Sequence, residues 1–282
     1  MKLKDSTILI TGAAGGIGSA TARRLGAGGA RLLLTDLRPE PLEKLADELR
    51  REGIEADCLA CDVCAPTGRA MLARRAEVED VDVLINIAGI NPFGLFVEQS
   101  DAEIEKTIAI NTIAPLLLCR ALLPELERRP EAHVVNVGSV FGSIGYPGFA
   151  AYSASKFAVR GFTEAMRREC ADTNVRFHYV APRATRTALS TDRISAMNEA
   201  LKVATDPPET VAAAIEKALL RSRRETWLGR PERFFGLINA LLPGLVDRAL
   251  VRQLPIIRRF AGKGPGAGRR DKSSANLTAL GV

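Results

Sequence analysis

Two residues near the middle of the chain have types and a spacing that suit proton transfer. Tyr152 and Lys156 stand four apart in the apolar-striped segment "AAYSASKFAVRGFTEAMRREC", residues 150–170. Residues four apart share one face of a helix, with Cβ atoms about 5–6 Å apart, so a phenol and an ammonium can serve the same small volume. The alternative is that Tyr152 packs in the core and Lys156 extends to solvent. The remaining motifs must decide between these interpretations.

A glycine-rich turn follows the first strand-like run. Gly12, Gly16 and Gly18 in "TGAAGGIGSATARRLGAGG" give G-x-x-x-G-x-G, which lets backbone approach a pyrophosphate at a helix N-terminus. A second strand-like run ends in Asp36, whose carboxylate can accept hydrogen bonds from both hydroxyls of an adenosine ribose and would repel a 2′-phosphate. Arg38 could instead bind that phosphate. The pattern favours NAD over NADP.

The elements that must position these residues alternate regularly along the chain. Aliphatic or β-branched runs are mostly followed by a turn and a helix-compatible stretch. The runs are "STILITG", "ARLLLTD", "EADCLACDV", "VDVLINIAG", "AHVVNVGS" and "NVRFHYVAP", with a short seventh in "ETWLG". This alternation predicts an α/β fold, a Rossmann-type doubly wound parallel sheet of about seven strands with helices on both faces. Residues 185–206 lack strong periodicity and are predicted to form a loop or a small helical lid.

With these motifs in this order, the chain resembles the short-chain dehydrogenase/reductase family in its single-domain form of ~250 residues. The resemblance covers residues 5–231 and rests on "TGAAGGIG", Asp36, "CDV" with Asp62, "NIAG" at 86–89, Asn111, Ser139 and "YSASK". It implies a catalytic set of Asn111, Ser139, Tyr152 and Lys156. It also implies cofactor contacts from Gly12, Gly16, Ile17, Gly18, Asp36, Asp62, Val63, Asn86, Ala88, Gly89, Tyr152, Lys156, Pro182 and Thr187.

The resemblance assigns a chemical role to each catalytic residue. A phenol with an ordinary pKa of about 10 is a poor base, and Lys156 together with the positive nicotinamide would lower the pKa of Tyr152. Ser139 would hold the substrate oxygen and polarise a carbonyl. Asn111 would bend its helix and anchor a water that connects Lys156 to solvent.

Two positions depart from the family pattern. Ile87 replaces the second asparagine of the usual "NNAG", a mild change. In "APRATRT", Pro182 and Thr187 match, but Arg183 stands where the family usually has glycine, so the local turn must differ or tolerate a side chain. We expect the Arg183 guanidinium to face solvent rather than an anion of the cofactor or substrate.

Composition favours an intracellular enzyme with one large core. The 282 residues are 46% hydrophobic and 26% charged, and we find neither a signal region nor an apolar run of the ~18 residues that span a bilayer. The spacing of Cys58, Cys61 and Cys64 superficially suggests a metal site, but "EADCLACDV" reads as a buried strand on which residues three apart face opposite ways. We therefore predict no metal site. His133 and His178 are predicted to be core residues.

The basic charge of the chain lies at its C-terminal end. The net charge is +6, and from Lys217 onward fourteen Lys and Arg stand against four Asp and Glu, which leaves a mildly acidic remainder and argues against a nucleic-acid enzyme. We divide the chain into a dinucleotide-binding and catalytic domain (1–231), an apolar-basic helical extension (232–260) and a disordered tail (261–282).

The extension has two open interpretations. The apolar block "FFGLINALLPGLV" presents Phe234, Phe235, Leu237, Ile238, Leu241 and Leu242, and is bordered by Arg230, Arg233, Arg248, Arg252, Arg258 and Arg259. It could contact an anionic membrane, which would make the substrate lipid-like, or it could pack on the core or across a dimer. By resemblance, homodimers or homotetramers would form through the helices that contain Asn111 and Tyr152.

These observations favour a cytoplasmic NAD(H)-dependent oxidoreductase that interconverts a secondary alcohol and a ketone. The first alternative is an NADPH-dependent ketoreductase acting on an acyl thioester. Two alternatives outside catalysis are a dinucleotide sensor without turnover and a scaffold recruited to membranes. The intact set of Asn111, Ser139, Tyr152 and Lys156 counts against a sensor, which needs only the glycine turn and Asp36.

Overall fold

Seven parallel strands form one sheet in the order β3-β2-β1-β4-β5-β6-β7. The computed structural model describes residues 1–262, except for the side chain of Arg230. The strands are β1 (Thr7–Thr11), β2 (Arg31–Thr35), β3 (Ala56–Cys58), β4 (Val83–Asn86), β5 (Ala132–Val137), β6 (Val175–Ala181) and β7 (Glu225–Trp227). The doubly wound parallel sheet predicted from the sequence is confirmed, including the short seventh strand at its edge.

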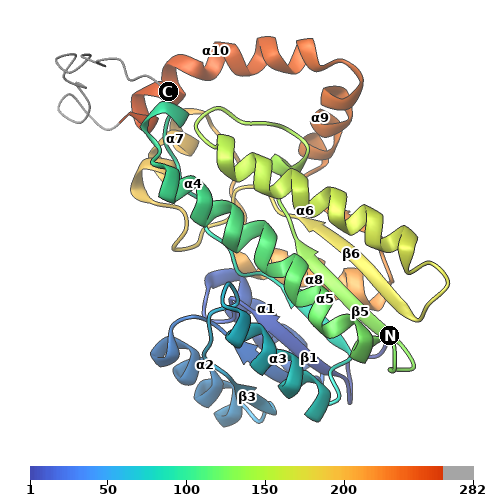
Figure 1. Cartoon of the computed structure of the whole chain (residues 1–282). Helices are drawn as coiled ribbons and strands as arrows, with labels where there is room; N and C mark the ends of the chain where they lie inside the picture. The colour runs from blue at the N-terminus through green and yellow to red at the C-terminus, as the bar shows by residue number, and fades with distance from the viewer. Residues whose placement is uncertain (263–282) are drawn as a thin grey trace, which may run out of the picture.

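Helices connect the strands and cover both faces of the sheet (Figure 1). The α-helices are α1 (Gly16–Ala27), α2 (Pro39–Arg51), α3 (Pro66–Val78), α4 (Asp101–Ile108), α5 (Ala114–Leu126), α6 (Ala150–Glu169), α7 (Asp192–Ala200), α8 (Pro208–Leu220), α9 (Arg230–Leu241) and α10 (Pro243–Ala261). Shorter turns are η1 (Phe96–Glu98), the π-helical η2 (Ala109–Ile113) and η3 (Val140–Gly142). The stretch predicted as a loop or small helical lid is a loop that contains α7.

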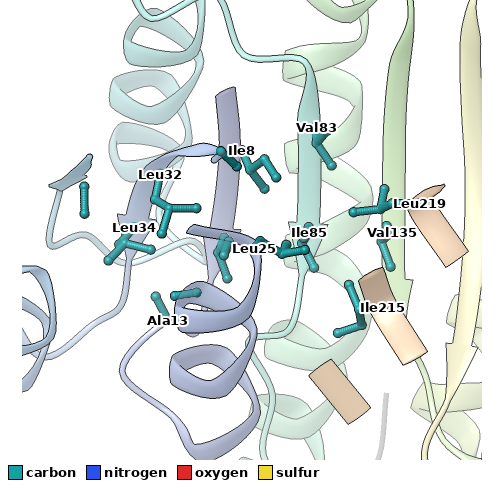
Figure 2. Packing of buried hydrophobic residues seen from close by; sticks show 14 of the residues in the cluster. Ile8, Ala13, Leu25, Leu32, Leu34, Val83, Ile85, Val135, Ile215 and Leu219 are labelled. Carbon is teal, nitrogen blue, oxygen red and sulfur yellow. The ribbon is translucent and has the colours of Figure 1, made fainter. Parts of the chain in front are cut away.

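Two apolar layers hold the helices to the sheet. Side chains alternate along a strand, so Ile8 and Ile10 of β1 face one layer and Leu9 faces the other. The first layer, seen in Figure 2, packs Leu25 of α1 and Ile215 of α8 against the strands. The second layer packs residues of α3 and α5, among them Leu72, Leu118 and Leu122. Because both faces are covered, ligands must bind at the ends of the strands rather than on a face of the sheet.

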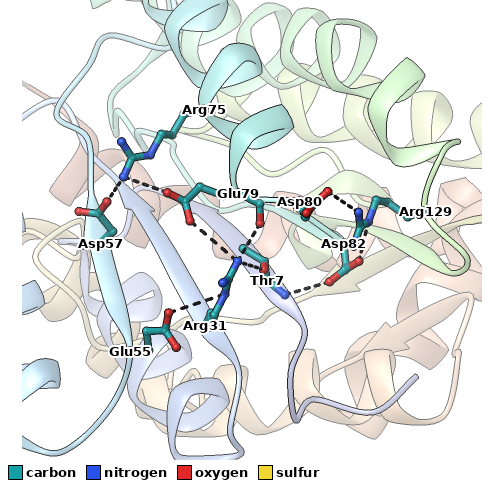
Figure 3. A network of polar contacts seen from close by, with 9 residues as sticks. All are labelled: Thr7, Arg31, Glu55, Asp57, Arg75, Glu79, Asp80, Asp82 and Arg129. Atoms are coloured by element: carbon teal, nitrogen blue, oxygen red, sulfur yellow. Dashed lines mark hydrogen bonds and ion pairs between the residues drawn. The ribbon is translucent and has the colours of Figure 1, made fainter.

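A network of ion pairs closes the sheet at the amino ends of its strands (Figure 3). Arg31 at the start of β2 donates to the Thr7 hydroxyl and to the Glu79 carbonyl, each at 2.9 Å. Asp82 accepts from the Thr7 amide and from Arg129, each at 3.0 Å. These contacts join the loops before β2 and β4 at the amino ends of the strands.

The strand predicted for "EADCLACDV" was too long. β3 ends at Cys58, and the chain then turns because the Asp62 carboxylate accepts from the Cys64 amide at 2.8 Å, just before α3. The argument that Cys61 and Cys64 face opposite ways on a strand therefore fails. Burial raises the pKa of both thiols, and within residues 1–262 no three His, Cys, Asp or Glu side chains form a group that could hold a metal ion.

One helical stretch is long and apolar enough to cross a membrane by length and composition alone. It runs from Asp101 to Leu126 with a mean hydropathy of 1.5, although our reading of the sequence had found no apolar run of that length. The core helix of a soluble protein passes the same test. In this fold Leu118, Leu122 and Leu126 are buried against the sheet, and 39% of the apolar window is buried as a whole.

The basic-apolar region after Pro231 contains two helices. α9 and α10 fold over the end of the molecule where α4 and α6 begin, far from the N terminus (Figure 1). The predicted boundaries of the extension and of the tail remain predictions. Of the tail predicted as disordered (261–282), residues 263–282 lie outside the described residues.

The two histidines form a buried hydrogen-bonded pair between β5 and β6. The Arg223 carbonyl can only accept, so the 2.7 Å contact places a proton on His178 Nδ1. His133 Nδ1 lies 2.8 Å from His178 Nε2, and His133 Nε2 lies 3.2 Å from the Glu131 carboxylate. Both side chains are essentially inaccessible to solvent, which confirms their prediction as core residues. Burial lowers the pKa of His178 from 6.5 to about 4, since a charged ring would lose its hydration.

We predict that this pair makes folding stability depend on pH. Between pH 6.5 and about 4 the unfolded chain binds a proton at residue 178 and the native chain does not, so stability falls as the pH falls through this window. The full loss for such a shift is about 3 kcal/mol. Urea unfolding of wild type and His178→Asn at neutral and mildly acidic pH measures it. Equal pH slopes in the two proteins would contradict the prediction.

Candidate active site

A single cavity of about 380 Å³ gathers the central residues predicted for catalysis. It lies beyond the carboxyl ends of the strands and is lined by Ser139, Tyr152 and Lys156. Of the predicted cofactor residues, Ile17, Gly89, Pro182 and Thr187 line the same cavity. Ligands of doubly wound sheets bind at this edge. The structure therefore brings the reactive side chains and part of the glycine-turn region to one volume.

Ser139 is held in place by a residue that our reading of the sequence did not single out. The Tyr179 hydroxyl donates to the Ser139 carbonyl at 3.0 Å and accepts from the Ser139 amide at 3.3 Å. The Ser139 hydroxyl accepts from the Phe141 amide at 3.1 Å, which leaves its own proton free to donate. The signal for Tyr179 was its place in the buried run "RFHYVAP", because a buried phenol needs a partner.

Tyr152 and Lys156 lie on one face of α6, as their spacing predicted. The Lys156 Nζ lies 5.7 Å from the centre of the Tyr152 ring and donates to the Val137 carbonyl at 3.0 Å. Lys156 is buried, with 6% of its surface exposed, and does not extend to solvent. Burial lowers the pKa of Lys156 to about 8, because the site opposes its charge.

The expected lowering of the Tyr152 pKa is not seen in the protein alone. Burial raises the pKa of Tyr152 to about 12, and the Ser139 side chain only partly opposes this shift. The physical reason is that a phenolate at this buried position would lose its hydration. Tyr152 is therefore a proton donor in this state.

Asn111 occurs where the helix after Ser100 is interrupted by the π turn η2. Its side-chain oxygen accepts from the Ile90 amide at 2.8 Å, and its nitrogen donates to the Ile90 carbonyl at 2.9 Å and to the Ser155 hydroxyl at 3.1 Å. Ser155 in turn donates to the Tyr152 carbonyl at 2.6 Å. Asn111 thus fastens the loop after β4 to α6. The predicted water link to Lys156 remains a prediction.

The glycine turn has the shape that a dinucleotide requires. Gly12 has a φ of 66°, and a Cβ there would lie 2.8 Å from the backbone of Ala88. A Cβ on Gly18 would lie 2.2 Å from the Gly12 carbonyl oxygen. Larger residues would force the turn apart, so only glycines allow β1, the turn and the 86–89 segment to pack this closely. The residues present thus fit a pyrophosphate at the N-terminus of α1.

The Asp36 side chain lies beside this turn, just after the carboxyl end of β2. Its carboxylate accepts from the Ala14 amide and from the Arg38 amide, both at 3.2 Å. The Arg38 guanidinium lies 3.5 Å from Asp36, and its side chain is 63% exposed. The carboxylate is thus oriented by backbone donors, while the arginine remains accessible to a ligand.

Of the other predicted cofactor residues, Asp62, Val63 and Ala88 lie at the surface or beside the glycine turn, and Asn86 is buried in the sheet. Val63 is partly buried and Asp62 is exposed, with its carboxylate used in the turn before α3. Ala88 lies against Gly12, as the family pattern implies. The Asn86 side chain, however, is buried and donates to the Asn136 side-chain oxygen at 2.9 Å. It helps to hold β4 to β5 and does not line the cavity.

The prediction that Arg183 faces solvent was wrong. Its guanidinium donates to both oxygens of Asp206, at 2.9 and 2.8 Å, and to Glu232 at 3.3 Å. These hydrogen bonds raise the pKa of the guanidinium further, and its side chain is only 24% exposed. The sequence could not reveal this, because Asp206 and Glu232 are 23 and 49 residues away.

The C-terminal helices pack on the core, which was one of the two interpretations of the extension, and they also form a wall of the cavity, which the sequence did not predict. The lining residues from this region are Glu232, Phe235, Val246, Ala249, Leu250 and Gln253. Those of α10 recur at helical spacing, so one face of the helix lines the cavity. The Tyr146 hydroxyl donates to Gln253 at 2.9 Å, and Asn239 donates to the Ser143 carbonyl at 2.8 Å. We call α9 and α10 the roof.

Comparisons with known proteins agree with this geometry. The family model described as short chain dehydrogenase matches residues 6–198. Oxidoreductase UcpA of Escherichia coli (strain K12) is 34% identical over 221 residues, which cover 77% of this chain and 81% of that protein.

Two solved structures share the fold. A short chain dehydrogenase/reductase from Burkholderia phymatum in complex with NAD has a TM-score of 0.80 and 22% identity, and covers 87% of this chain and 96% of its own. A short chain dehydrogenase from Burkholderia cenocepacia J2315 in complex with NADP has a TM-score of 0.76 and 24% identity, and covers 89% and 99%. By its sequence match and its fold, this chain belongs to the short-chain dehydrogenase family.

Proposed function

We propose that this protein is an oxidoreductase that transfers hydride between NAD(H) and a secondary alcohol or ketone. The observation that carries the proposal is the meeting of Ser139, Tyr152 and Lys156 on the wall of one apolar cavity, next to the glycine turn. A dinucleotide sensor or scaffold would need the turn and Asp36 but not these three groups. The relatives and neighbours that are oxidoreductases or contain NAD or NADP support the same class of activity.

The protein side of the reaction follows from the protonation states. Tyr152 holds its proton because its pKa is raised to about 12, so it can deliver that proton to a carbonyl oxygen as an alcohol forms. Ser139 can donate a hydrogen bond to the same oxygen and polarise the carbonyl. When bound, the nicotinamide supplies or accepts the hydride. In the oxidative direction Tyr152 must lose its proton, which positive charge beside it favours.

The choice between the two dinucleotides follows from Asp36 and Arg38. Asp36 is held by two backbone amides, so its carboxylate cannot easily move away from a ribose at the end of β2. A 2′-phosphate there would meet a fixed negative charge, and we therefore propose NAD as the preferred cofactor. An NADPH-dependent ketoreductase is the second candidate, and the exposed Arg38 guanidinium favours it.

The cavity also indicates the class of substrate. Its lining includes Ile194 and Met197 of α7 and Val246 and Leu250 of α10. Such a lining excludes water and binds apolar surface. We therefore propose a lipid-like alcohol or ketone, with Gln253 and Asn198 as its polar neighbours in the cavity.

The outer side of the roof supports a peripheral membrane contact. Phe234, Leu237, Leu241 and Leu242 are between 56% and 70% exposed, although they are large and apolar. Exposed arginines accompany them on the same two helices, namely Arg233, Arg248, Arg252, Arg258 and Arg259. Apolar side chains with arginine neighbours suit the headgroup region of an anionic bilayer. A cytoplasmic protein that rests on such a surface could take an apolar substrate directly from it.

We also propose that the protein forms a homodimer or homotetramer. Ile113 and Phe157 are 48% and 43% exposed on the segments that contain Asn111 and Tyr152. Exposed apolar residues on these helices suit pairing with a second copy of the chain. The proposed partners are therefore small molecules, a membrane surface and further copies of this chain, and nucleic acid is not expected.

Replacing Tyr152 by Phe should lower turnover by at least about a hundredfold, because the proton donor is lost. Binding of NADH should change little, since the ring and Lys156 remain. Steady-state rates with a panel of ketones and alcohols, together with NADH fluorescence titration, measure both quantities. Tyr146→Phe is the matched control, since that phenol contacts Gln253 in the roof. Near-normal activity of Tyr152→Phe would remove the tyrosine from the mechanism.

Replacing Asp36 by Ala should narrow the preference for NAD over NADP, because the charge that opposes the 2′-phosphate is gone. Replacing Arg38 by Ala should leave NAD use intact and weaken any residual NADP use. The ratio of kcat/KM values for the two cofactors measures both effects. A wild-type protein that turns over only with NADP would show that Arg38, not Asp36, decides the choice.

Full-length protein should sediment with anionic phosphatidylserine vesicles at low salt, and much less with neutral phosphatidylcholine vesicles. A variant with Phe234, Leu237 and Leu241 changed to Ser should remain in the supernatant. The matched control changes Met71 and Val78, which are 50% and 69% exposed on α3, to Ser. If neither the wild type nor the variant with the three changes in the roof sediments with the vesicles, and that variant changes its oligomeric state, this face serves subunit packing.

A further inference from the structure

Arg183 joins three segments that are far apart in the chain. It lies just after β6, and its bidentate contact with Asp206 reaches the segment between α7 and α8. Its remaining contact reaches Glu232 in the first turn of α9. The side chains of Asp206 and Glu232 are 11% and 24% exposed. The contact with Asp206 is charge-assisted and bidentate, which is the strong form of an arginine contact, whereas Glu232 is held by a single contact at 3.3 Å.

The first segment, residues 183–187, borders the place where the cofactor must bind. A Cβ built on Gly16 would lie 2.9 Å from the Thr187 side chain, so this loop crosses directly over the glycine turn. Backbone bonds tie the loop to residue 206, since the Arg186 amide donates to the Asp206 carbonyl at 2.9 Å and the Asp206 amide donates to Ala184 at 2.8 Å. Any ligand between the turn and Thr187 must contact or shift this unit.

The second segment is the roof over the substrate. Glu232 begins the helix that carries Phe235 into the cavity and Asn239 onto the Ser143 carbonyl. Arg193 of α7 donates to the Phe260 and Ala261 carbonyls at the far end of α10, at 2.8 and 2.5 Å. The roof is thus fastened at its far end to α7, along its length to the loop after Ser139, and at its start to Arg183.

We propose that Arg183 is a positioning residue that couples cofactor binding to closure of the roof over the substrate. Three of its five N–H donors bind the two carboxylates, which fix the direction of the guanidinium. The proposal rests on the proposed function in one respect, namely that NAD(H) lies between the glycine turn and Thr187. A cofactor that orders residues 183–187 orders Glu232 with them. By reciprocity, a substrate under the roof must tighten binding of the cofactor by the same factor.

Hydrogen exchange measured with and without NADH tests this coupling without knowledge of the substrate. In wild type, NADH should slow amide exchange at residues 16–18 and also in α9, the latter by at least about fivefold for a coupling of ordinary size. In Arg183→Met, exchange at residues 16–18 should still respond to NADH and exchange in α9 should not. Glu232→Leu should behave like Arg183→Met, and the double variant should add no further loss.

Three controls separate the possible explanations. Arg186→Met removes an exposed arginine from the same loop and should leave the response of α9 unchanged. Arg183→Lys should restore only part of the response, because an ammonium cannot hold Asp206 bidentately and reach Glu232 as well. Arg183→Gly supplies the residue that the family pattern favours and should uncouple the roof as Met does.

The outcomes are distinguishable from failure of the proposed function. No change at residues 16–18 of the wild type would mean that NADH does not bind there, which contradicts the proposed function itself. A response at residues 16–18 without one in α9 of the wild type overturns the coupling alone. A response in α9 that persists in Arg183→Met also overturns it. If Arg183→Met speeds exchange in α9 by the same factor with and without NADH, the response of α9 to NADH is retained, and the contact is a structural tether without coupling.

Discussion

Parallel pairing of all seven strands is the constraint on which the rest of this structure depends. Parallel strands need long crossover connections, and the helices in these crossovers cover both faces of the sheet with apolar side chains. One edge, at the amino ends, is closed by the ion pairs around Arg31 and Asp82. At the carboxyl ends of the strands, the turn after β1, the loop after β5 and the loop after β6 lie close together. The cavity that contains Ser139, Tyr152 and Lys156 lies at these carboxyl ends.

Burial then determines what the gathered groups can do. The Lys156 ammonium has no carboxylate partner among the contacts of its side chain and rests on the Val137 carbonyl, so its pKa falls to about 8. The same burial raises the pKa of Tyr152 to about 12. Burial thus shifts both groups toward their neutral forms, and the Tyr152 phenol keeps its proton at neutral pH. A positive charge brought in by a ligand shifts this balance toward phenolate.

The sequence correctly predicted those features that depend on residues close together in the chain. Strand-helix alternation indicated the sheet, and the spacing of Tyr152 and Lys156 correctly placed both on one helix face. It failed where the partner is distant in the chain. Arg183 was assigned to solvent because Asp206 and Glu232 cannot be paired with it by spacing. Tyr179 was missed because its role is to hold Ser139, 40 residues away. The strand predicted around Cys58 was too long, because the turn that follows it depends on the single side chain of Asp62.

The departure at position 183 and the extension after Pro231 belong together. Arg183 lies within the 6–198 segment that matches the family model, and Glu232 lies outside it. A glycine at 183 would have no side chain to reach α9, and α9 without Arg183 would lose a charged contact at its first turn. The roof brings apolar side chains over a cavity that would otherwise open to water, and it leaves other apolar side chains exposed on its outer side. One arginine thus links the segment that matches the family model to the helices that form a wall of the cavity.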